Sequence, residues 1–241
     1  MPHPPTNLVI GASGAIGSAV AAALAATSHP LITVSRQPTL AIQFDGPHRH
    51  LQCDYSSEAI ARCAASLNQA ALSRVVICNG RLHDNPIWPE KRLEELTSEA
   101  MQALFTSNAV VPLQWLQALL PAAKGKQPCV IAALSARIGS IGDNGLGGWY
   151  SYRMSKAALN MGLQTAAIEY GRRAKNARLL AFHPGTTDSA LSAPFQASVP
   201  PEKLFSPDFV AQQLLRAMTE TESQPPGAAR FVDWQGKTIP W

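Results

Sequence analysis

Short apolar runs alternate along the chain with longer segments in which apolar residues recur every three or four positions. The short runs predict buried strands, and the longer segments predict helices that bury one face. In residues 15–26, for example, Ile16, Val20 and Leu24 lie four residues apart and would share one face of a helix. Nearly continuous apolar strands separated by helices indicate a parallel sheet that is covered on both faces.

The predicted elements follow one another in a regular order. Strands are expected over residues 8–10, 31–35, 50–53, 75–78, 129–134, 178–182 and 230–233, and helices over 15–26, 56–68, 98–120, 150–172 and 207–219. Residues 37–48 are rich in proline and glycine, so we expect a crossover helix to be missing there. Pro112 has no backbone N–H and should kink the helix over 98–120.

This order predicts one α/β domain over residues 1–241, a doubly wound Rossmann fold with a parallel sheet of about seven strands. The length suits a single domain, and 46% hydrophobic residues against 15% charged residues supply a large core. Residues 1–5 are expected to be loose.

The net charge of +4 suits an anionic ligand but does not require one. A predicted helix ends within the densest basic stretch, where basic side chains complement the helix dipole. That stretch contains Arg172, Arg173, Lys175 and Arg178. We favour this interpretation over a nucleic-acid patch and expect no nucleic-acid partner.

The four cysteines show no Cys-x-x-Cys spacing, and three of them fall in apolar, strand-like runs: Cys53, Cys63, Cys78 and Cys129. Free thiols in a reducing compartment are the simpler interpretation, and we expect a cytoplasmic protein. His48 and His50 have no further ligands at metal spacing, so no metal site is predicted.

Residues 7–28 carry no charge and are long enough to span a bilayer. They are rich in glycine, serine and alanine, and no Lys or Arg precedes them. We therefore favour a buried strand, turn and helix over a membrane segment or signal peptide, and expect no membrane partner.

A glycine-rich turn, Gly11-Ala12-Ser13-Gly14-Ala15-Ile16-Gly17, joins the first strand to the first helix. Glycine lets the backbone turn tightly and approach a pyrophosphate, and the helix N-terminus adds free N–H groups and a positive dipole. The position between a strand and a helix makes the pattern more specific than isolated glycines. The sequence therefore predicts a dinucleotide site here.

Ser35 and Arg36 end the second strand, where an acidic residue would bind the ribose hydroxyls and repel a 2′-phosphate. A hydroxyl and a guanidinium suit a phosphate instead. We therefore predict NADP(H) in preference to NAD(H). The alternative is that Arg36 simply lies at the surface.

Tyr152 and Lys156 lie four residues apart on a predicted helix and so share one face. A free tyrosine has a pKa near about 10, and a nearby ammonium lowers it. Tyr152 can then protonate a carbonyl oxygen while hydride reaches the carbon. A Tyr-x-x-x-Lys pair often occurs by chance, so it indicates a reductase site only together with the motifs around it.

With those motifs, the chain resembles the short-chain dehydrogenase/reductase family over nearly its full length. The family's glycine motif is matched at the first turn, its adenine-contacting aspartate after the third strand, and its serine after the fifth strand. The matching positions are Gly11, Gly14, Gly17, Asp54, Asn108, Ser135, Tyr152, Lys156, Pro184 and Gly185.

The resemblance implies a catalytic set of Asn108, Ser135, Tyr152 and Lys156. Tyr152 would act as general acid in reduction and as base in oxidation, and Ser135 would orient the substrate and stabilise the oxyanion. Lys156 would bind the nicotinamide ribose and tune Tyr152, and Asn108 would keep a water in a proton relay. The alternatives are that Asn108 is a helix polar group satisfied by neighbouring backbone and that Ser135 caps a helix or turn. Further cofactor contacts are expected at Ser13, Ala15, Ile16, Tyr55, Asn79, Gly80, Thr187 and Ser189.

Three positions depart from the family pattern. Ala15 replaces the middle glycine, Asn79 stands where alanine is usual, and Ser189 takes the usual threonine position. The Gly-rich loop 139–148 is longer than usual and is either a substrate entrance or plain surface. Ser140 is a weaker candidate than Ser135, and Tyr150 has Met154 rather than a lysine four residues later.

Residues 135–140, 147–152 and 239–241 further resemble the C-factor-like members, some associated with cell–cell signalling and others with carbonyl reduction. We expect an NADP(H)-dependent carbonyl reductase or alcohol dehydrogenase that acts on a small-molecule carbonyl or alcohol. The alternative is a non-catalytic dinucleotide-binding regulator. A sugar-nucleotide epimerase is disfavoured because little chain follows Gly185 to build a substrate domain.

The loop over residues 186–206 should close over the substrate. Its apolar residues suggest a hydrophobic aldehyde or ketone, or else ordinary packing: Leu191, Phe195, Leu204 and Phe205. The resemblance also implies a homodimer or homotetramer that pairs through the two long helices. Trp115 and Leu119 are candidates for that contact, or for the core.

Overall fold

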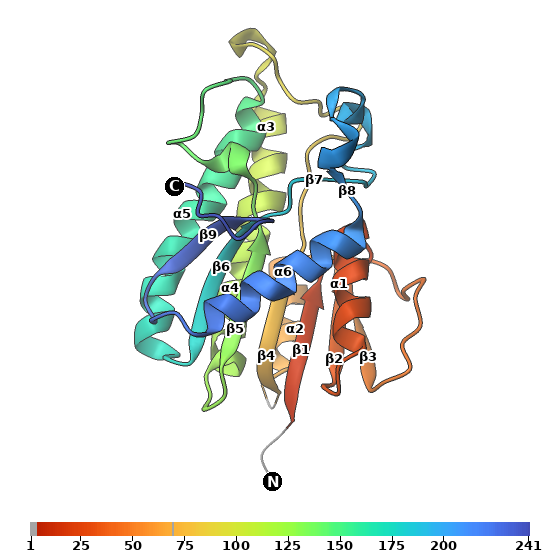
Figure 1. The fold of residues 1–241 in the computed structure, drawn as a ribbon, viewed down its shortest axis with the longest axis vertical. Coiled ribbons are helices and arrows are strands. Elements are labelled where there is room, and N and C mark those ends of the chain that lie inside the picture. Colours follow the sequence, from red (N-terminus) through yellow and green to blue (C-terminus); the bar gives the residue numbers. More distant parts are fainter. Residues whose placement is uncertain (1–3, 69) are drawn as a thin grey trace.

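A seven-stranded, entirely parallel sheet forms the centre of the computed structural model, which describes residues 4–68 and 70–241 (Figure 1). Its strand order is β3-β2-β1-β4-β5-β6-β9. The strands are β1 (Pro5–Ile10), β2 (Leu31–Ser35), β3 (His48–Gln52), β4 (Ala71–Ile77), β5 (Cys129–Leu134), β6 (Ala177–His183) and β9 (Ala229–Asp233). The order reverses between β1 and β4, which is where doubly wound sheets bind their ligands. The predicted fold class is confirmed.

Two layers of helices bury the two faces of this sheet (Figure 1). Alternate residues of β1 point to opposite sides, so Leu8 and Ile10 enter one core and Val9 enters the other. The core around Val9 is closed by α1 (Ala15–Ala25) and α6 (Pro207–Glu222). The opposite core is closed by α2 (Ser57–Ala65), α4 (Val111–Ala123) and α5 (Tyr150–Arg173).

The long helix predicted over 98–120 is divided into three parts. α3 (Ser98–Phe105) is followed by a π-helical turn, Thr106–Val110, and then by α4. Pro112 cannot donate the backbone hydrogen bond that an α-helix needs, and the wider π-turn lies directly before it. The distortion is therefore centred on Asn108, four residues before the predicted kink at Pro112.

Residues 37–47 contain no helix, as predicted, and β3 begins at His48 rather than at residue 50. The side chain of Thr33 lies 2.8 Å from His48 Nε2 and 2.9 Å from His50 Nδ1. These contacts join β2 to the edge strand β3 through side-chain hydrogen bonds.

The predicted looseness of residues 1–5 is wrong at Pro5, which begins β1; residues 1–3 lie outside the described part of the chain.

Trp115 and Leu119 are completely buried in the core of their own chain, so neither is on the surface for an oligomer contact. The short strands β7 (Thr186–Thr187) and β8 (Leu204–Phe205) form a second, two-stranded sheet that was not predicted. Short 3₁₀ turns lie at η1 (Leu93–Glu95), η3 (Arg137–Gly139), η4 (Ala193–Ser198) and η5 (Pro201–Lys203).

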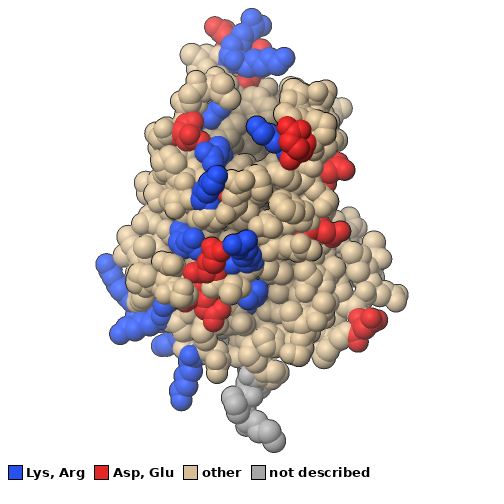
Figure 2. Space-filling model, in the orientation of Figure 1, with Lys and Arg blue, Asp and Glu red and all other residues tan. Residues whose placement is uncertain are grey.

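Residues 7–28 fold as the end of β1, a turn and α1. Among the residues described, no helix has both the length and the apolar character required to cross a bilayer. On the face shown in Figure 2, basic side chains gather at the lower left edge, acidic side chains lie along the right edge, and the two kinds meet near the centre.

Candidate active site

The glycine-rich turn leaves the N-terminus of α1 open to a ligand. Gly11 has a φ of +83°, and its N–H donates to the carbonyl of Val34 at 2.9 Å. A Cβ on Gly17 would lie 2.2 Å from the carbonyl oxygen of Gly11, so only glycine permits this close packing. No side chain caps the helix at Gly14, and its first turn carries no acidic residue. The free N–H groups therefore remain available for a phosphate.

Ala15, which replaces a family glycine, is exposed in this turn together with Ser13 and Gly14. Ile16 is half-buried and packs against the core between α1 and α6. The alanine thus leaves the turn intact.

The turn after β2 exposes Arg36 but not Ser35. Ser35 is fully buried, and its hydroxyl accepts a hydrogen bond from the N–H of Gln37 at 3.1 Å. The side chain of Gln52 donates to the carbonyl of Arg36 at 3.1 Å. Of the predicted pair, the structure therefore presents only the Arg36 side chain to solvent.

Tyr55 and Asn79 lie together beside this turn. Burial raises the pKa of Tyr55 to about 12, against the opposing effects of the Asn79 side chain and the Arg36 charge. Asn79 Oδ1 is buried and has no hydrogen-bond partner among the described residues. Asp54 is exposed and accepts from the N–H of Ser56 at 2.9 Å, at the start of α2. An unpaired amide oxygen at this position fits a bound nucleoside better than a closed core.

Tyr152 and Lys156 are brought together one turn apart on α5. Their side chains are almost buried, at 9% and 3% exposure, and Lys156 Nζ lies 5.8 Å from the centre of the Tyr152 ring. Lys156 Nζ donates to the carbonyl of Leu134 at 2.9 Å. Burial lowers the pKa of Lys156 to about 8 and raises the pKa of Tyr152 well above its ordinary value. The lowering of the Tyr152 pKa that the sequence predicted from Lys156 is therefore wrong: burial raises this pKa, and the phenol is protonated at neutral pH.

Ser135 follows β5 on the side of the sheet that faces α5. Its hydroxyl donates to Asn160 Oδ1 at 2.5 Å, and both residues are buried. Asn160 Nδ2 donates in turn to the carbonyl of Gly139 at 3.2 Å. Asn160 was not predicted, although it lies four residues after Lys156 and so shares the face of Tyr152 and Lys156.

Asn108 lies in the middle of the π-turn and is completely buried. Its Oδ1 accepts from the N–H of Arg81 at 2.7 Å, and its Nδ2 donates to the carbonyl of Arg81 at 2.8 Å. Nδ2 also lies 3.0 Å from the hydroxyl of Ser155. A Cβ on Gly80 would be 3.8 Å from Lys156 Nζ and 3.9 Å from Asn108 Oδ1, so these three residues meet at the end of β4.

The segment after β6 brings Gly185 and Thr187 to the same edge. Gly185 has a φ of +73°, and a Cβ there would lie 2.6 Å from the Phe205 ring. Thr187 is buried, and its hydroxyl has no partner in the described chain. The Ser189 hydroxyl donates to the carbonyl of Thr187 at 3.2 Å. Thr187 rather than Ser189 therefore holds the unengaged hydroxyl.

The loop 139–148 is fastened to the end of the chain. Arg137 pairs with Asp143 at 2.9 Å and with Asp233 at 3.1 Å. The Ser140 hydroxyl donates to the carbonyl of Pro240 at 2.5 Å, which commits it to this anchor and not to the position of Ser135. Tyr150 begins α5, and Met154 is exposed one turn later.

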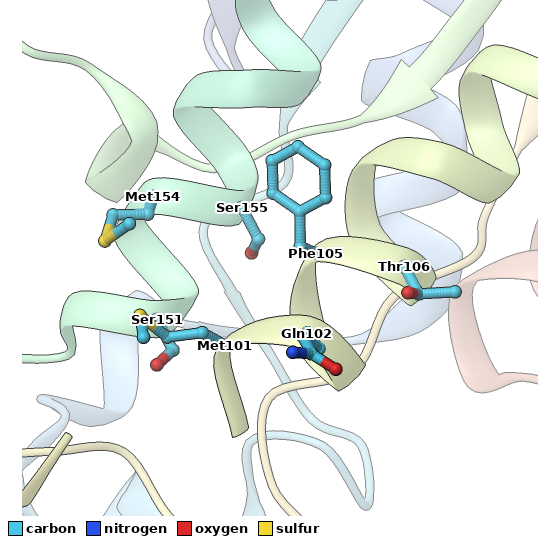
Figure 3. Close-up of a pocket in the computed structure, with 7 residues that line it drawn as sticks. All are labelled: Met101, Gln102, Phe105, Thr106, Ser151, Met154 and Ser155. Carbon is cyan, nitrogen blue, oxygen red and sulfur yellow. The ribbon is translucent and has the colours of Figure 1, made fainter. Parts of the chain in front are cut away.

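A hollow of about 330 Å³ lies between α3 and α5, beside this constellation (Figure 3). Ser151 and Ser155 line it from the residues directly before Tyr152 and Lys156, so it opens on a neighbouring face of α5. None of the predicted site residues lines it. Its walls are Met101, Gln102, Phe105, Thr106, Ser151, Met154 and Ser155.

Comparisons with known proteins concern the sequence and the fold of the chain. The family model of short chain dehydrogenases matches residues 6–199. The C-signal protein of Myxococcus xanthus is 34% identical over 141 residues, which are 58% of this chain and 78% of that protein.

Two solved structures show the same fold. A short-chain dehydrogenase/reductase from Burkholderia multivorans with bound NADP has a TM-score of 0.81 at 22% identity, covering 99% of this chain and all of that chain. An NADPH-bound carbonyl reductase from chicken fatty liver has a TM-score of 0.80 at 22% identity, with the same coverage.

Proposed function

The chain belongs to the short chain dehydrogenase family, and we propose that it is an NADP(H)-dependent oxidoreductase that transfers hydride between the nicotinamide and a carbonyl or alcohol substrate. Structures of the same fold with bound NADP or NADPH support this cofactor, and one of them is a carbonyl reductase. The relation to C-signal agrees with the C-factor-like resemblance of the sequence.

The observation that carries the proposal is the buried ammonium of Lys156 beside the buried phenol of Tyr152. None of the ion pairs formed by the described residues involves Lys156. An unpaired buried charge costs free energy and is kept where a site needs it. A ribose hydroxyl and a phenol undergoing proton transfer would both use this ammonium.

The residues present fit a dinucleotide at the carboxyl edge of the sheet. The free N–H groups at Gly14–Ile16 would hold the pyrophosphate. The unpaired Asn79 Oδ1 would face the adenosine half, and the unpaired Thr187 hydroxyl would face the nicotinamide half. The exposed guanidinium of Arg36 would bind a 2′-phosphate, which favours NADP(H) over NAD(H).

The nicotinamide, when bound, supplies or accepts the hydride. Tyr152 would give its hydroxyl proton to the carbonyl oxygen during reduction and take it back during oxidation. Ser135 would bind the same oxygen, Lys156 would hold the ribose and replenish the proton, and Asn108 would fix the turn at Arg81 and Gly80 beside Lys156.

A second candidate is a dinucleotide-binding signalling protein without turnover, which the name of the M. xanthus relative favours. Both candidates would bind the cofactor through the same glycine-rich turn. They differ because only the oxidoreductase needs proton transfer by Tyr152.

The test uses thermal unfolding and NADPH oxidation of the purified protein and two variants. NADPH at about one hundred times its dissociation constant should stabilise the fold by roughly 2.7 kcal/mol, and more than NADH does. Tyr152→Phe should keep this stabilisation and lose turnover of a carbonyl panel by several orders of magnitude. Tyr150→Phe is the matched control and should retain activity. Cofactor binding without turnover in the wild type would favour the signalling candidate.

A further inference from the structure

Four aromatic rings from three separate segments gather next to Tyr152. We call the set His83, Trp88, Trp149 and Phe195 the aromatic cluster. The Phe195 ring lies 5.5 Å from His83, 5.3 Å from Trp88 and 4.9 Å from Trp149, between ring centres. His83 and Trp88 are 5.3 Å apart. Such tilted and edge-on arrangements are the favourable ones for aromatic pairs.

Trp149 connects this cluster to the candidate reaction centre. Its ring lies 6.3 Å from that of Tyr152. Trp149 has a φ of +53°, and its N–H donates to the carbonyl of Glu90 at 2.5 Å. The Glu90 carboxylate accepts from the N–H and the hydroxyl of Ser151, at the start of α5. Glu90 thus holds the backbone at Trp149 and the start of α5 together, next to Tyr152.

Two arginines beside the cluster have partners. Arg81 pairs through one terminal nitrogen with Asp84 at 2.5 Å, although its buried Nε has no partner among the described residues, and Arg153 donates to the carbonyl of Gly148 at 2.8 Å. His83 Nε2 lies 3.0 Å from the carbonyl of Leu191. A substrate group entering here would meet ring faces and apolar side chains rather than a counter-ion.

Phe195 lies on a short, largely exposed segment of the cluster. It belongs to η4, in which no residue is buried, and the segment is held at Ser192 by its hydroxyl bond to the carbonyl of Thr187. Trp88 on the other side of the ring is 53% exposed. The Phe195 ring packs on the edge of a small core cluster that includes Tyr152, so its displacement would open the space between Trp149 and that cluster.

We propose that the aromatic cluster is an aryl subsite, in which the aromatic ring of an uncharged aldehyde or ketone takes the place of Phe195 against Trp149. The substrate carbonyl would then lie at Tyr152, whose ring is the next neighbour of the Trp149 ring. This proposal rests on the oxidoreductase function proposed above and narrows its substrate to aryl-bearing carbonyl compounds.

The test compares phenylacetaldehyde with cyclohexylacetaldehyde, whose rings are similar in size and are both insulated from the carbonyl by one methylene. With NADPH, kcat/KM should favour phenylacetaldehyde by roughly two- to tenfold, the gain that an added aromatic pair provides. Trp149→Leu should bring this ratio to about one, and Trp149→Phe should restore it. Trp88→Leu, at an exposed ring, should lower the ratio with little risk to folding.

Phe209→Leu is the matched control, because Phe209 belongs to a different set of rings with Phe205 and Trp234. Its ratio should equal that of the wild type. Turnover of both aldehydes without an aryl preference, or a preference that survives Trp149→Leu, would overturn the subsite and leave the oxidoreductase function standing.

A binding measurement separates the two proposals. Each alcohol is titrated by calorimetry into the protein with NADP⁺ present. 2-Phenylethanol should bind more tightly than 2-cyclohexylethanol, and Trp149→Leu should abolish the difference. This result without any turnover would support the subsite and reject the function. Equal binding of the two alcohols would reject the subsite.

Discussion

Ser135 donates its hydroxyl hydrogen to Asn160 Oδ1 across 2.5 Å. The direction of this bond is fixed by a third group, because the carbonyl of Gly139 can only accept. Asn160 must therefore point its Nδ2 at Gly139, as it does at 3.2 Å, and its oxygen at Ser135. The Ser135 hydrogen is therefore engaged by Asn160, and it must turn away from Asn160 Oδ1 before Ser135 can donate to a carbonyl oxygen.

Asn160→Leu should lower kcat for carbonyl reduction by about tenfold, because the Ser135 hydroxyl loses the partner that holds its rotamer; tenfold corresponds to ~1.4 kcal/mol. The same substitution in a Ser135→Ala background should change kcat less than twofold. Steady-state kinetics of the wild type, both single variants and the double variant measure this coupling. Equal losses in both backgrounds would mean that Asn160 acts on the fold and not through Ser135.

Gly139→Ala should be strongly harmful, whereas Gly145→Ala in the same loop should be neutral. A Cβ on Gly139 would lie 2.7 Å from Lys156 Cβ and 2.8 Å from the Lys156 backbone, while one on Gly145 meets nothing within 4 Å. We expect Gly139→Ala to cost roughly 1–3 kcal/mol of unfolding free energy and most of the activity, because α5 must move. Urea unfolding and kcat/KM check both variants, and similar behaviour of the two would refute the close approach.

Lys156→Met should be more stable than the wild type at pH 7.5, and this advantage should shrink as the pH rises to 10. The pKa of Lys156 falls from 10.5 to about 8 on burial. Between these values the unfolded chain holds the proton that the folded protein releases, so the wild type gains unfolding free energy as the pH rises. The expected change is on the order of 2 kcal/mol. Unfolding curves at several pH values measure it, and a constant difference would contradict a buried ammonium.

Arg36→Leu should weaken NADPH binding by about tenfold to a hundredfold and leave NADH binding nearly unchanged, because only the 2′-phosphate needs the guanidinium. Arg49→Leu removes another exposed arginine, on the neighbouring edge strand, and should change neither. Fluorescence titration with both nucleotides gives the dissociation constants. An equal loss for NADPH and NADH would show that Arg36 contacts a part common to both.

The sequence predicted the parts of the site that depend on short-range spacing. Tyr152 and Lys156 share a face because they lie one helical turn apart, and the turn after β1 is defined by Gly11, Gly14 and Gly17. Asn160 follows the same spacing rule and could have been predicted. Ser35 could not be assigned in this way, because its burial depends on how the turn at Gln37 folds back onto its hydroxyl.

Features that depend on distant segments were outside the reach of the sequence. The aromatic cluster needs His83, Trp149 and Phe195, which lie far apart in the chain and meet only in the fold. The sequence predicted a kink at Pro112, whereas the irregular turn lies before it at Thr106–Val110, where Asn108 binds the backbone of Arg81.

The π-turn at Thr106–Val110 also sets the rotational phase of the helix that follows it. Each residue of an α-helix advances the chain by about 100° around the axis. Deleting one residue in this turn would therefore shorten the helix only slightly but rotate α4 by that angle. Trp115 is completely buried, and this rotation would turn its side chain away from the core. A π-turn contains one residue more than an α-helical turn. With this residue both Asn108 and Trp115 point into the protein, whereas a uniform α-helix would turn one of them away.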